Sequence, residues 1–102
     1  MHPFDVWLAK ARWGNCDDPR PWVIVDARES EVYGCFPIAT ECYTGGCFPI
    51  RRGDADFQAT GLQHDCYVHD ETVMELPVSA FIEHSGRMEG EMLFRFREHS
   101  GL

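Results

Sequence analysis

The sequence has little positive charge and no long apolar run. Its 9 lysine and arginine residues stand against 17 aspartate and glutamate residues, which gives a formal net charge of −8. Because phosphate binding relies on lysine and arginine, this balance counts against nucleic acid as a partner. No apolar stretch approaches the roughly 18 residues that a membrane span needs, so we expect no contact with a membrane interior.

The first residues also lack the features of an export signal. Met1-His2-Pro3-Phe4 is not a basic segment followed by a long apolar run. We therefore expect a cytoplasmic protein. The 102 residues fit a single domain, residues 1–102, and 44% hydrophobic with 25% charged residues is the balance of an ordinary globular protein.

The cysteines are odd in number, and no Cys-x-x-Cys pair occurs among the five. Without an export signal, we expect them to remain reduced thiols. Zinc binding is the alternative, because four residues separate Cys42 from Cys47, a loose spacing for ligands. The other candidate ligands lie close together in sequence and are His64, Cys66 and His69. We expect no metal and no other cofactor.

Short apolar segments between turn residues indicate a sheet of short strands. The strands are predicted at residues 4–9, 21–26, 32–39, 66–68 and 73–76. Thr44-Gly45-Gly46 predicts a turn that joins Cys42-Tyr43 to residues 47–50 in a hairpin. Many short strands with turns between them are typical of a small antiparallel barrel.

Helical periodicity occurs only near the end of the chain. One helical turn is predicted at residues 78–82, after Pro77. The apolar residues of 88–98 recur on one face, which predicts a short last helix. The fold class is thus mainly β, an antiparallel barrel of five to seven strands with a C-terminal helix. The residues expected to be largely buried are Val6, Leu8, Val23, Val25, Ile38, Val68, Leu76 and Phe96.

Arg20-Pro21 stands at the entrance of the apolar run Trp22–Val25. A guanidinium cannot lie deep in such a strand without a partner, and proline cannot donate to the strand ladder. An arginine in this place is most simply a surface ion-pair residue. Trp13, in the preceding polar loop, is the tryptophan expected to be exposed, where it could stack on a base.

The order of these segments resembles the PemK/MazF family of toxin endoribonucleases. Asp5-Val6-Trp7-Leu8 resembles the family's opening strand, and Arg20 to Val25 resembles its Arg-Pro-Val-Val-Val run. Pro37-Ile38-Ala39-Thr40 resembles the strand that ends in a functional Thr or Ser. Weaker matches are Gly61-Leu62 with Asp65–Val68, where Cys66 replaces Ser, and Leu76-Pro77 with Gly86–Met88. Many members carry an arginine around the strand that here reads 72–76, and none is present.

The resemblance implies an SH3-like barrel that cleaves single-stranded RNA without a metal, forms a homodimer and is paired with an antitoxin peptide. It also implies that Arg20 and Thr40 are catalytic. Arginine suits the phosphate because its planar fork donates two parallel hydrogen bonds and stays charged. The general base remains open among Asp17, Glu41 and His64, because no spacing favours one of them.

Two other functions fit the same expected fold. A non-catalytic SH3-like barrel would keep the scaffold as a binding module without the chemistry. A gyrase-directed toxin of the CcdB type shares this fold, but its activity is associated with a Trp-Gly-Ile end. This chain ends in Ser100-Gly101-Leu102, which disfavours that alternative.

Overall fold

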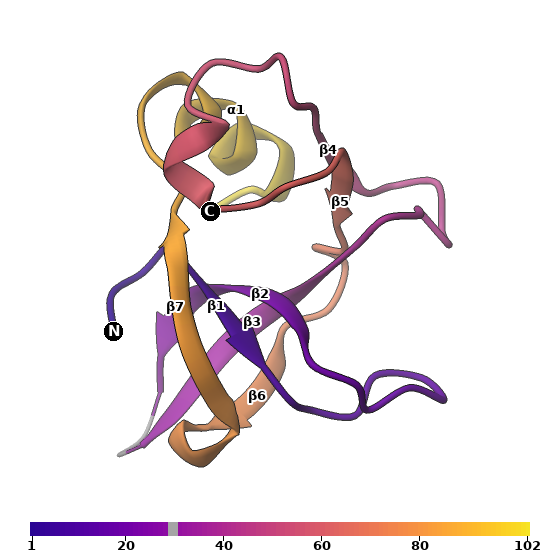
Figure 1. Ribbon diagram of the computed structural model, residues 1–102, viewed down its shortest axis with the longest axis vertical. Coiled ribbons are helices and arrows are strands. Elements are labelled where there is room, and N and C mark those ends of the chain that lie inside the picture. Colours follow the sequence, from indigo (N-terminus) through magenta and orange to yellow (C-terminus); the bar gives the residue numbers. More distant parts are fainter. Residues whose placement is uncertain (29–30) are drawn as a thin grey trace.

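The computed structural model describes residues 1–28 and 31–102, which form an antiparallel sheet followed by one α-helix (Figure 1). The strands are β1 (Asp5–Ala9), β2 (Arg20–Ala27), β3 (Val32–Ala39), β4 (Phe48–Ile50), β5 (Cys66–Val68), β6 (Met74–Pro77) and β7 (Phe81–Arg87). The helices are the short 3₁₀ turns η1 (Gln58–Thr60) and η2 (Val78–Ala80) and the α-helix α1 (Gly90–Ser100).

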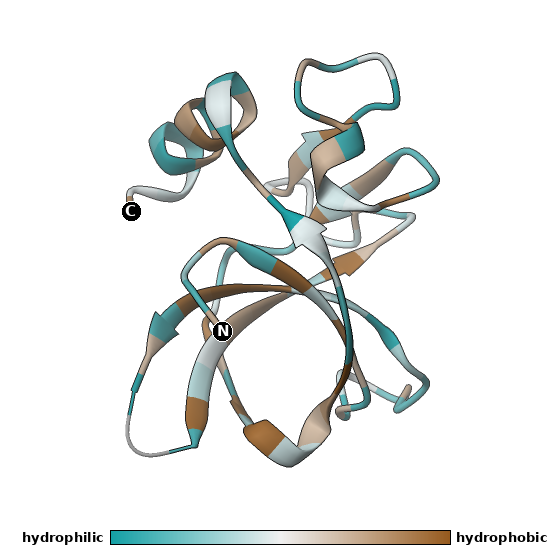
Figure 2. Cartoon of the chain, turned by 60° about the vertical axis from the view of Figure 1, so that its left-hand side comes forward, coloured by the Kyte–Doolittle hydropathy of each residue, from teal (hydrophilic) through white to brown (hydrophobic). Residues whose placement is uncertain are grey.

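The sheet bends around β3, which pairs with three other strands. Its first half pairs with β6, Tyr33 opposite Leu76, and its last residues pair with β5, Ile38 opposite Val68. The sheet runs in the order β4-β5-β3-β2-β1-β7, and Figure 2 shows its strands curving around a shared interior. The sheet is open but roughly barrel-shaped, which confirms the predicted antiparallel barrel with a terminal helix.

Buried side chains lie on both faces of β2, which explains its continuous apolar run. Trp22, Val23 and Ile24 are all buried, although successive residues of a strand point to opposite faces. The helix-side cluster contains Val6, Val23, Phe36, Ile38, Phe48, Ile50, Phe57, Cys66, Val68, Met88, Met92 and Phe96. The tryptophan-side cluster contains Ala9, Trp22, Ile24, Cys35 and Leu76, with Trp7 and Trp13 packed against it.

The last helix is held in place by one buried aromatic ring. Phe96 meets Phe4, Phe36 and Phe48 edge-on, with ring centroids 5.3–6.3 Å apart. The backbone N–H of Glu91 in the first turn donates to the Asp56 carboxylate at 2.9 Å. The helix therefore closes the helix-side cluster, close to the span predicted from its apolar face.

Most of the expected core is confirmed, with two exceptions. Leu8 and Val25 are half-buried. The buried members of the predicted set are Val6, Val23, Ile38, Val68, Leu76 and Phe96. None of the helices in the described part of the chain is long and apolar enough to cross a membrane.

One predicted element is wrong, and another is shorter than predicted. Phe48–Ile50 pairs with β5 and not with Cys42-Tyr43, so the predicted hairpin does not form. The predicted helical turn at 78–82 is a 3₁₀ turn over Val78–Ala80 that leads directly into β7. This strand pairs with β1 at the sheet edge, and its side chains are mostly exposed, so it shows no apolar alternation.

Candidate functional site

Arg20 lies at the start of β2 with its guanidinium against an aromatic ring. The guanidinium carbon lies 4.9 Å from the centre of the Trp13 ring, a cation–π contact. The Arg20 Nε is buried and has no hydrogen-bond partner. Arg20 takes part in no ion pair within residues 1–28 and 31–102. The structure thus leaves this cation without a carboxylate partner in the described part of an acidic protein.

The loop before β2 is folded so that Trp13 reaches Arg20. Trp13 and Cys16 exchange two backbone hydrogen bonds, of 2.8 and 3.2 Å. Gly14 takes a φ of +62° in this tight turn, a conformation that glycine adopts without steric cost. Trp13 is half-buried, not fully exposed as expected, because its ring covers part of the tryptophan-side cluster.

A buried histidine packs against Trp13. His69 is 6% exposed, and its ring centre lies 4.7 Å from that of Trp13. Its Nε2 lies 2.9 Å from the Glu41 carbonyl oxygen. Since a carbonyl oxygen can only accept, Nε2 carries the proton and donates. Tyr43 stacks on the same ring, with centroids 5.4 Å apart and planes inclined by 26°.

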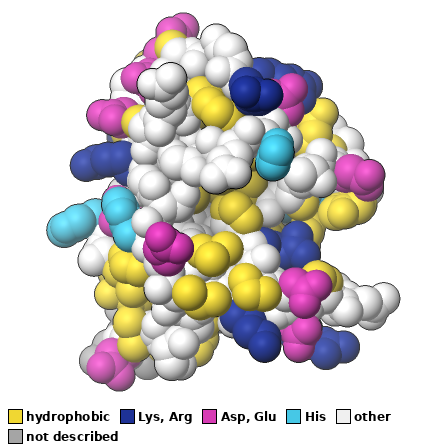
Figure 3. Space-filling view, in the orientation of Figure 1, with side chains coloured by type: hydrophobic (Ala, Val, Ile, Leu, Met, Phe, Trp, Pro, Cys, Tyr) yellow, Lys and Arg dark blue, Asp and Glu magenta, His cyan; other side chains and the backbone are white. Residues whose placement is uncertain are grey.

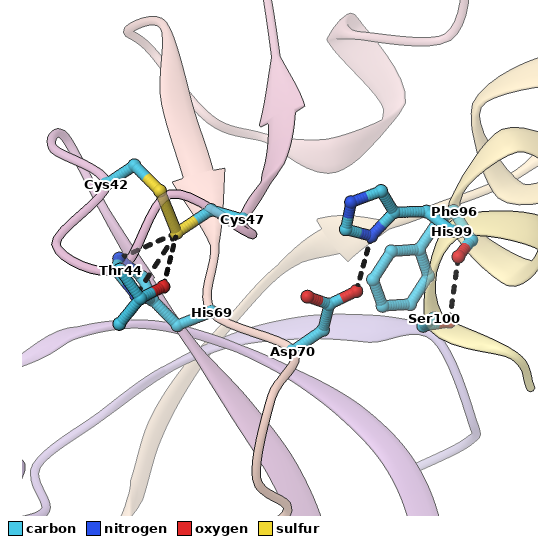
Figure 4. A network of polar contacts seen from close by, with 8 residues as sticks. All are labelled: Cys42, Thr44, Cys47, His69, Asp70, Phe96, His99 and Ser100. Carbon is cyan, nitrogen blue, oxygen red and sulfur yellow. Dashed lines mark hydrogen bonds and ion pairs between the residues drawn. A yellow bond between two sulfur atoms is a disulfide. The ribbon is translucent and has the colours of Figure 1, made fainter.

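Cys42 and Cys47 form a disulfide, with Cα atoms 5.8 Å apart, which corrects the expectation of five reduced thiols (Figure 4). The bond closes a short loop that contains Tyr43. Cys47 Sγ lies 3.4 Å from His69 Nδ1 and 3.6 Å from Thr44 Oγ1. With these two cysteines bonded to each other, they are not available as the zinc ligands considered above.

Thr40 lies on the other side of the same strand ends. It lines a cavity of about 480 Å³, and Arg20 and Trp13 do not. Pro21, the neighbour of Arg20, does line the cavity, as expected for successive residues of a strand that point to opposite faces. The structure therefore brings Arg20 together with Trp13, while Thr40 faces a separate cavity.

Several titratable groups share this cavity with Thr40. His64, Glu83 and His84 line it, whereas the other base candidates, Asp17 and Glu41, do not. The Nε2 of His84 lies 3.8 Å from the Asp5 carboxylate. Sequence reasoning missed Glu83 and His84 because it did not recognise β7 as a strand.

The buried thiols are unreactive near neutral pH. Burial raises the pKa of the Cys66 thiol, which lines the cavity, to about 11, with a smaller contribution from Asp65. Burial raises the pKa of Cys35 to about 12. Because the thiolate is the nucleophile, neither cysteine is reactive near neutral pH. In the described residues, no group of three or more His, Cys, Asp or Glu side chains is arranged to hold a metal.

The basic side chains on the face seen in Figure 3 are scattered over this face, and acidic side chains lie among them. A broad basic patch is thus not the basis for binding an anion on this face. Arg20 has a different setting, because the aromatic ring of Trp13 beside it brings no negative charge that would compete with an anion for the guanidinium.

The fold resembles that of a known toxin. The structure matches the Mycobacterium tuberculosis toxin MazF-mt6 with a TM-score of 0.71, over 95% of this chain and 92% of that chain. The fold is that of a MazF-type toxin. Only 17% of the residues are identical, so the likeness concerns the fold. No protein-family model matches the chain, and no curated protein sequence matches it.

Proposed function

We propose that this protein is a toxin-type endoribonuclease that cleaves single-stranded RNA without a metal ion. The observation that carries the proposal is the guanidinium of Arg20, held against Trp13 with its buried Nε unpartnered. A buried donor without a partner costs free energy, and an RNA phosphate would supply the missing acceptor. The MazF-type fold and the segment order around Arg20 agree with this function.

In the proposed reaction, a ribose 2′-hydroxyl attacks the adjacent phosphorus. A bond forms between the 2′-oxygen and phosphorus to give a 2′,3′-cyclic phosphate. The bond to the 5′-oxygen breaks, and this oxygen takes a proton from water and leaves as a hydroxyl. Negative charge grows on the phosphoryl oxygens in the transition state. Arg20 binds these oxygens through two parallel hydrogen bonds and stabilises the growing charge.

Thr40 and His64 act from the cavity side of the strand ends. Because β2 and β3 are antiparallel, the start of β2 and the end of β3 lie at the same end of the sheet. An RNA strand that crosses this end would meet Arg20 on one face and Thr40 on the other. Thr40 donates a hydrogen bond to the RNA, and His64, which lines the same cavity, accepts the proton of the 2′-hydroxyl.

The proposal includes a homodimer and a cognate antitoxin peptide as partners, acting in the cytoplasm. Exposed apolar side chains support association with other chains. Phe94 is 63% exposed on α1, and Leu102 follows the same helix with 44% exposure. Sedimentation is expected to give a dimer at tens of micromolar protein, and a monomer there would remove this part of the proposal.

The test is cleavage of varied single-stranded RNAs in the presence of a metal chelator. Arg20→Ala is expected to lower the cleavage rate by about 10²- to 10³-fold, the effect of removing a donor that stabilises transition-state charge. Thr40→Ala is expected to cost about tenfold or less, because it removes one neutral hydrogen bond. Arg28→Ala is the matched control, since Arg28 follows the far end of the same strand and pairs with Asp26 at 3.7 Å.

All three variants are expected to melt within a few degrees of the wild type, because none of these side chains is in the core. If the wild type cuts no RNA, or if Arg20→Ala cuts as fast as Arg28→Ala, the enzyme function is wrong. The non-catalytic binding module and the CcdB-type toxin then become the functions to test, the latter by inhibition of gyrase.

A further inference from the structure

The loop between Cys42 and Cys47 presents one aromatic side chain to solvent beside the Arg20 site. Tyr43 is 64% exposed, the highest value among the large hydrophobic side chains of the described residues. An exposed tyrosine is unremarkable when its ring moves freely. Here, however, one face of the ring is stacked on buried His69, and its centre lies 5.7 Å from that of Trp13. Most of the Tyr43 surface nevertheless remains accessible to solvent.

The His69 ring on which Tyr43 stacks is held rigidly. His69 is fixed from two directions, because its backbone N–H donates to the Pro37 carbonyl at 2.9 Å and its Nε2 donates to the Glu41 carbonyl. A flat ring fixed on one face and largely accessible to solvent is the arrangement on which a nucleobase stacks. A stacking surface that is already ordered loses little conformational entropy when a ligand binds.

The rings also lead directly to the phosphate-binding cation. Tyr43 contacts Trp13, and Trp13 carries the guanidinium of Arg20 on its face. A cation next to aromatic stacking surfaces is what single-stranded nucleic acid needs, since its charged backbone and its bases must both be bound. An apolar peptide would have no use for the unpaired cation. The ligand chemistry favoured by this combination is an unpaired nucleobase next to a phosphate.

The disulfide keeps the Tyr43 ring stacked on the His69 ring. The loop it closes contains Gly45, with a φ of +84°, and Gly46, and a side chain at Gly45 would touch nothing within 4 Å. Without the covalent bond, such a glycine-containing segment has many accessible conformations. His69 Nδ1 would then accept a hydrogen bond from the Cys47 thiol, which lies close to it already. Reduction would therefore retain Cys47 and release Cys42 together with Tyr43.

We infer that the loop closed by Cys42 and Cys47 presents Tyr43 as a stacking site for a nucleobase of single-stranded RNA, and that reduction of the disulfide weakens this site. The inference rests on the proposed RNA substrate but not on its cleavage. The redox step is a thiol–disulfide exchange with a dithiol. The dithiol gives two electrons and two protons, becomes a cyclic disulfide, and leaves two protein thiols.

The experiment measures binding of a fluorescent single-stranded oligonucleotide whose 2′-hydroxyls are all methylated, so that it cannot be cleaved. Tyr43→Ala is expected to raise the Kd about 5- to 150-fold, the range for the loss of one stacked base. Tyr43→Phe keeps the flat ring and is expected to stay within about threefold of wild type, while Tyr43→Leu, which has no flat ring, should bind as weakly as Tyr43→Ala. Ile82→Ala is the matched control, because Ile82 is 54% exposed on β7 and does not line the cavity.

The redox part is tested on the same oligonucleotide with and without dithiothreitol. Reduction is expected to weaken binding by the wild type but to change neither Tyr43→Ala nor the double variant Cys42→Ser/Cys47→Ser. Equal binding by wild type and Tyr43→Ala would overturn the stacking site. Free Cys42 and Cys47 thiols in the non-reduced protein, found by alkylation and mass spectrometry, would overturn the redox dependence, as would identical binding before and after reduction.

The outcomes for this site and for the proposed enzyme separate cleanly. Tyr43-dependent binding without cleavage of ordinary RNA supports the stacking site and removes the ribonuclease. Cleavage of ordinary RNA with no effect of Tyr43→Ala on binding supports the ribonuclease and removes the stacking site. Absence of binding by any oligonucleotide overturns the stacking site directly.

Discussion

The start of β2 and the end of β3 carry polar groups on both faces of the sheet, and the surroundings of these groups differ between the two faces. On the tryptophan side, Arg20 lies against Trp13, whose ring packs against those of His69 and Tyr43. On the cavity side, Thr40 and His64 line an open space of about 480 Å³. The first surrounding is suited to holding a fixed charge, whereas the second offers groups that exchange protons with water and with a substrate.

In the proposed reaction, one face of this end of the sheet binds charge and the other transfers protons. A guanidinium needs no proton transfer, so it can be partly buried among rings that exclude competing carboxylates. A general base must reach its substrate and must titrate, which an open cavity permits. The two faces are mechanically connected, because His69 holds the carbonyl of Glu41, the residue after Thr40.

The largest effect is expected on the wall of the cavity side. A Cβ at Gly86 in β7 would overlap the carbonyl oxygen of Ala59 and the backbone of Thr60 in η1. Because backbone cannot move aside as a flexible side chain does, Gly86→Ala is expected to lower the free energy of unfolding by about 1–3 kcal/mol. Urea unfolding measures this loss. Gly53→Ala is the control, because a Cβ there would meet nothing within 4 Å.

Gly86→Ala also tests whether the tryptophan side and the cavity side act separately. Gly86→Ala is expected to reduce RNA cleavage under conditions where the variant remains folded, while oligonucleotide binding through Tyr43 is retained. A variant as stable as Gly53→Ala would show that β7 and η1 are not in close contact. Equal loss of binding and cleavage would show that the two faces do not act separately.

A smaller effect is expected from the ring beneath Arg20. Trp13→Leu removes a cation–π contact of about 0.5–2 kcal/mol, which corresponds to a loss of about 2- to 30-fold in kcat/KM for RNA cleavage. Trp13→Phe is expected to retain part of the rate. If Trp13 acts through Arg20, the double variant Arg20→Ala/Trp13→Leu is no slower than Arg20→Ala alone. Fully additive losses would instead mean that Trp13 acts on the RNA independently.

The sequence indicated the tryptophan side of the site in part. Arg20-Pro21 predicted a strand entrance, and β2 does begin at Arg20. The contact between Trp13 and the guanidinium was not predicted, and Trp13 was expected to be exposed. β1, β2 and β3 were predicted because their residues alternate or form short apolar runs. Strong local patterns of this kind follow directly from burial on one or both faces of a strand.

The rest of the site depends on contacts that no local pattern encodes. β7 has mostly exposed side chains and is a strand because it pairs with β1, so Glu83 and His84 were not foreseen. The spacing of Cys42 and Cys47 is compatible with free thiols, a metal or a disulfide, and the pairing follows from how the chain returns after β3. Tyr43 and His69 meet through this same loop, across a separation that sequence alone does not bridge.

The smallest effect concerns the two buried thiols, one in each cluster. Cys66 belongs to the helix-side cluster and Cys35 to the tryptophan-side cluster, and burial raises the pKa of each, to about 11 and about 12, from a usual 9.0. Between pH 9 and 11 the unfolded chain loses these protons while the folded protein keeps them. The unfolded state then binds fewer protons, so the free energy of unfolding falls as the pH rises. Below about pH 8 the two thiols contribute no slope, because both states are protonated.

Urea unfolding at several pH values tests this dependence. Cys35→Ala and Cys66→Ala are each expected to remove up to about one proton from the alkaline slope, in addition to a loss of packing that is constant with pH. Cys16→Ala is the control, because Cys16 is a free and only half-buried thiol. The onset should come at the same pH for both buried thiols, since it is set by the unfolded chain, but the slope removed with Cys35 should persist to higher pH. An alkaline slope that is the same in wild type and in both buried-thiol variants would show that these cysteines ionise as readily in the folded protein as in the unfolded chain.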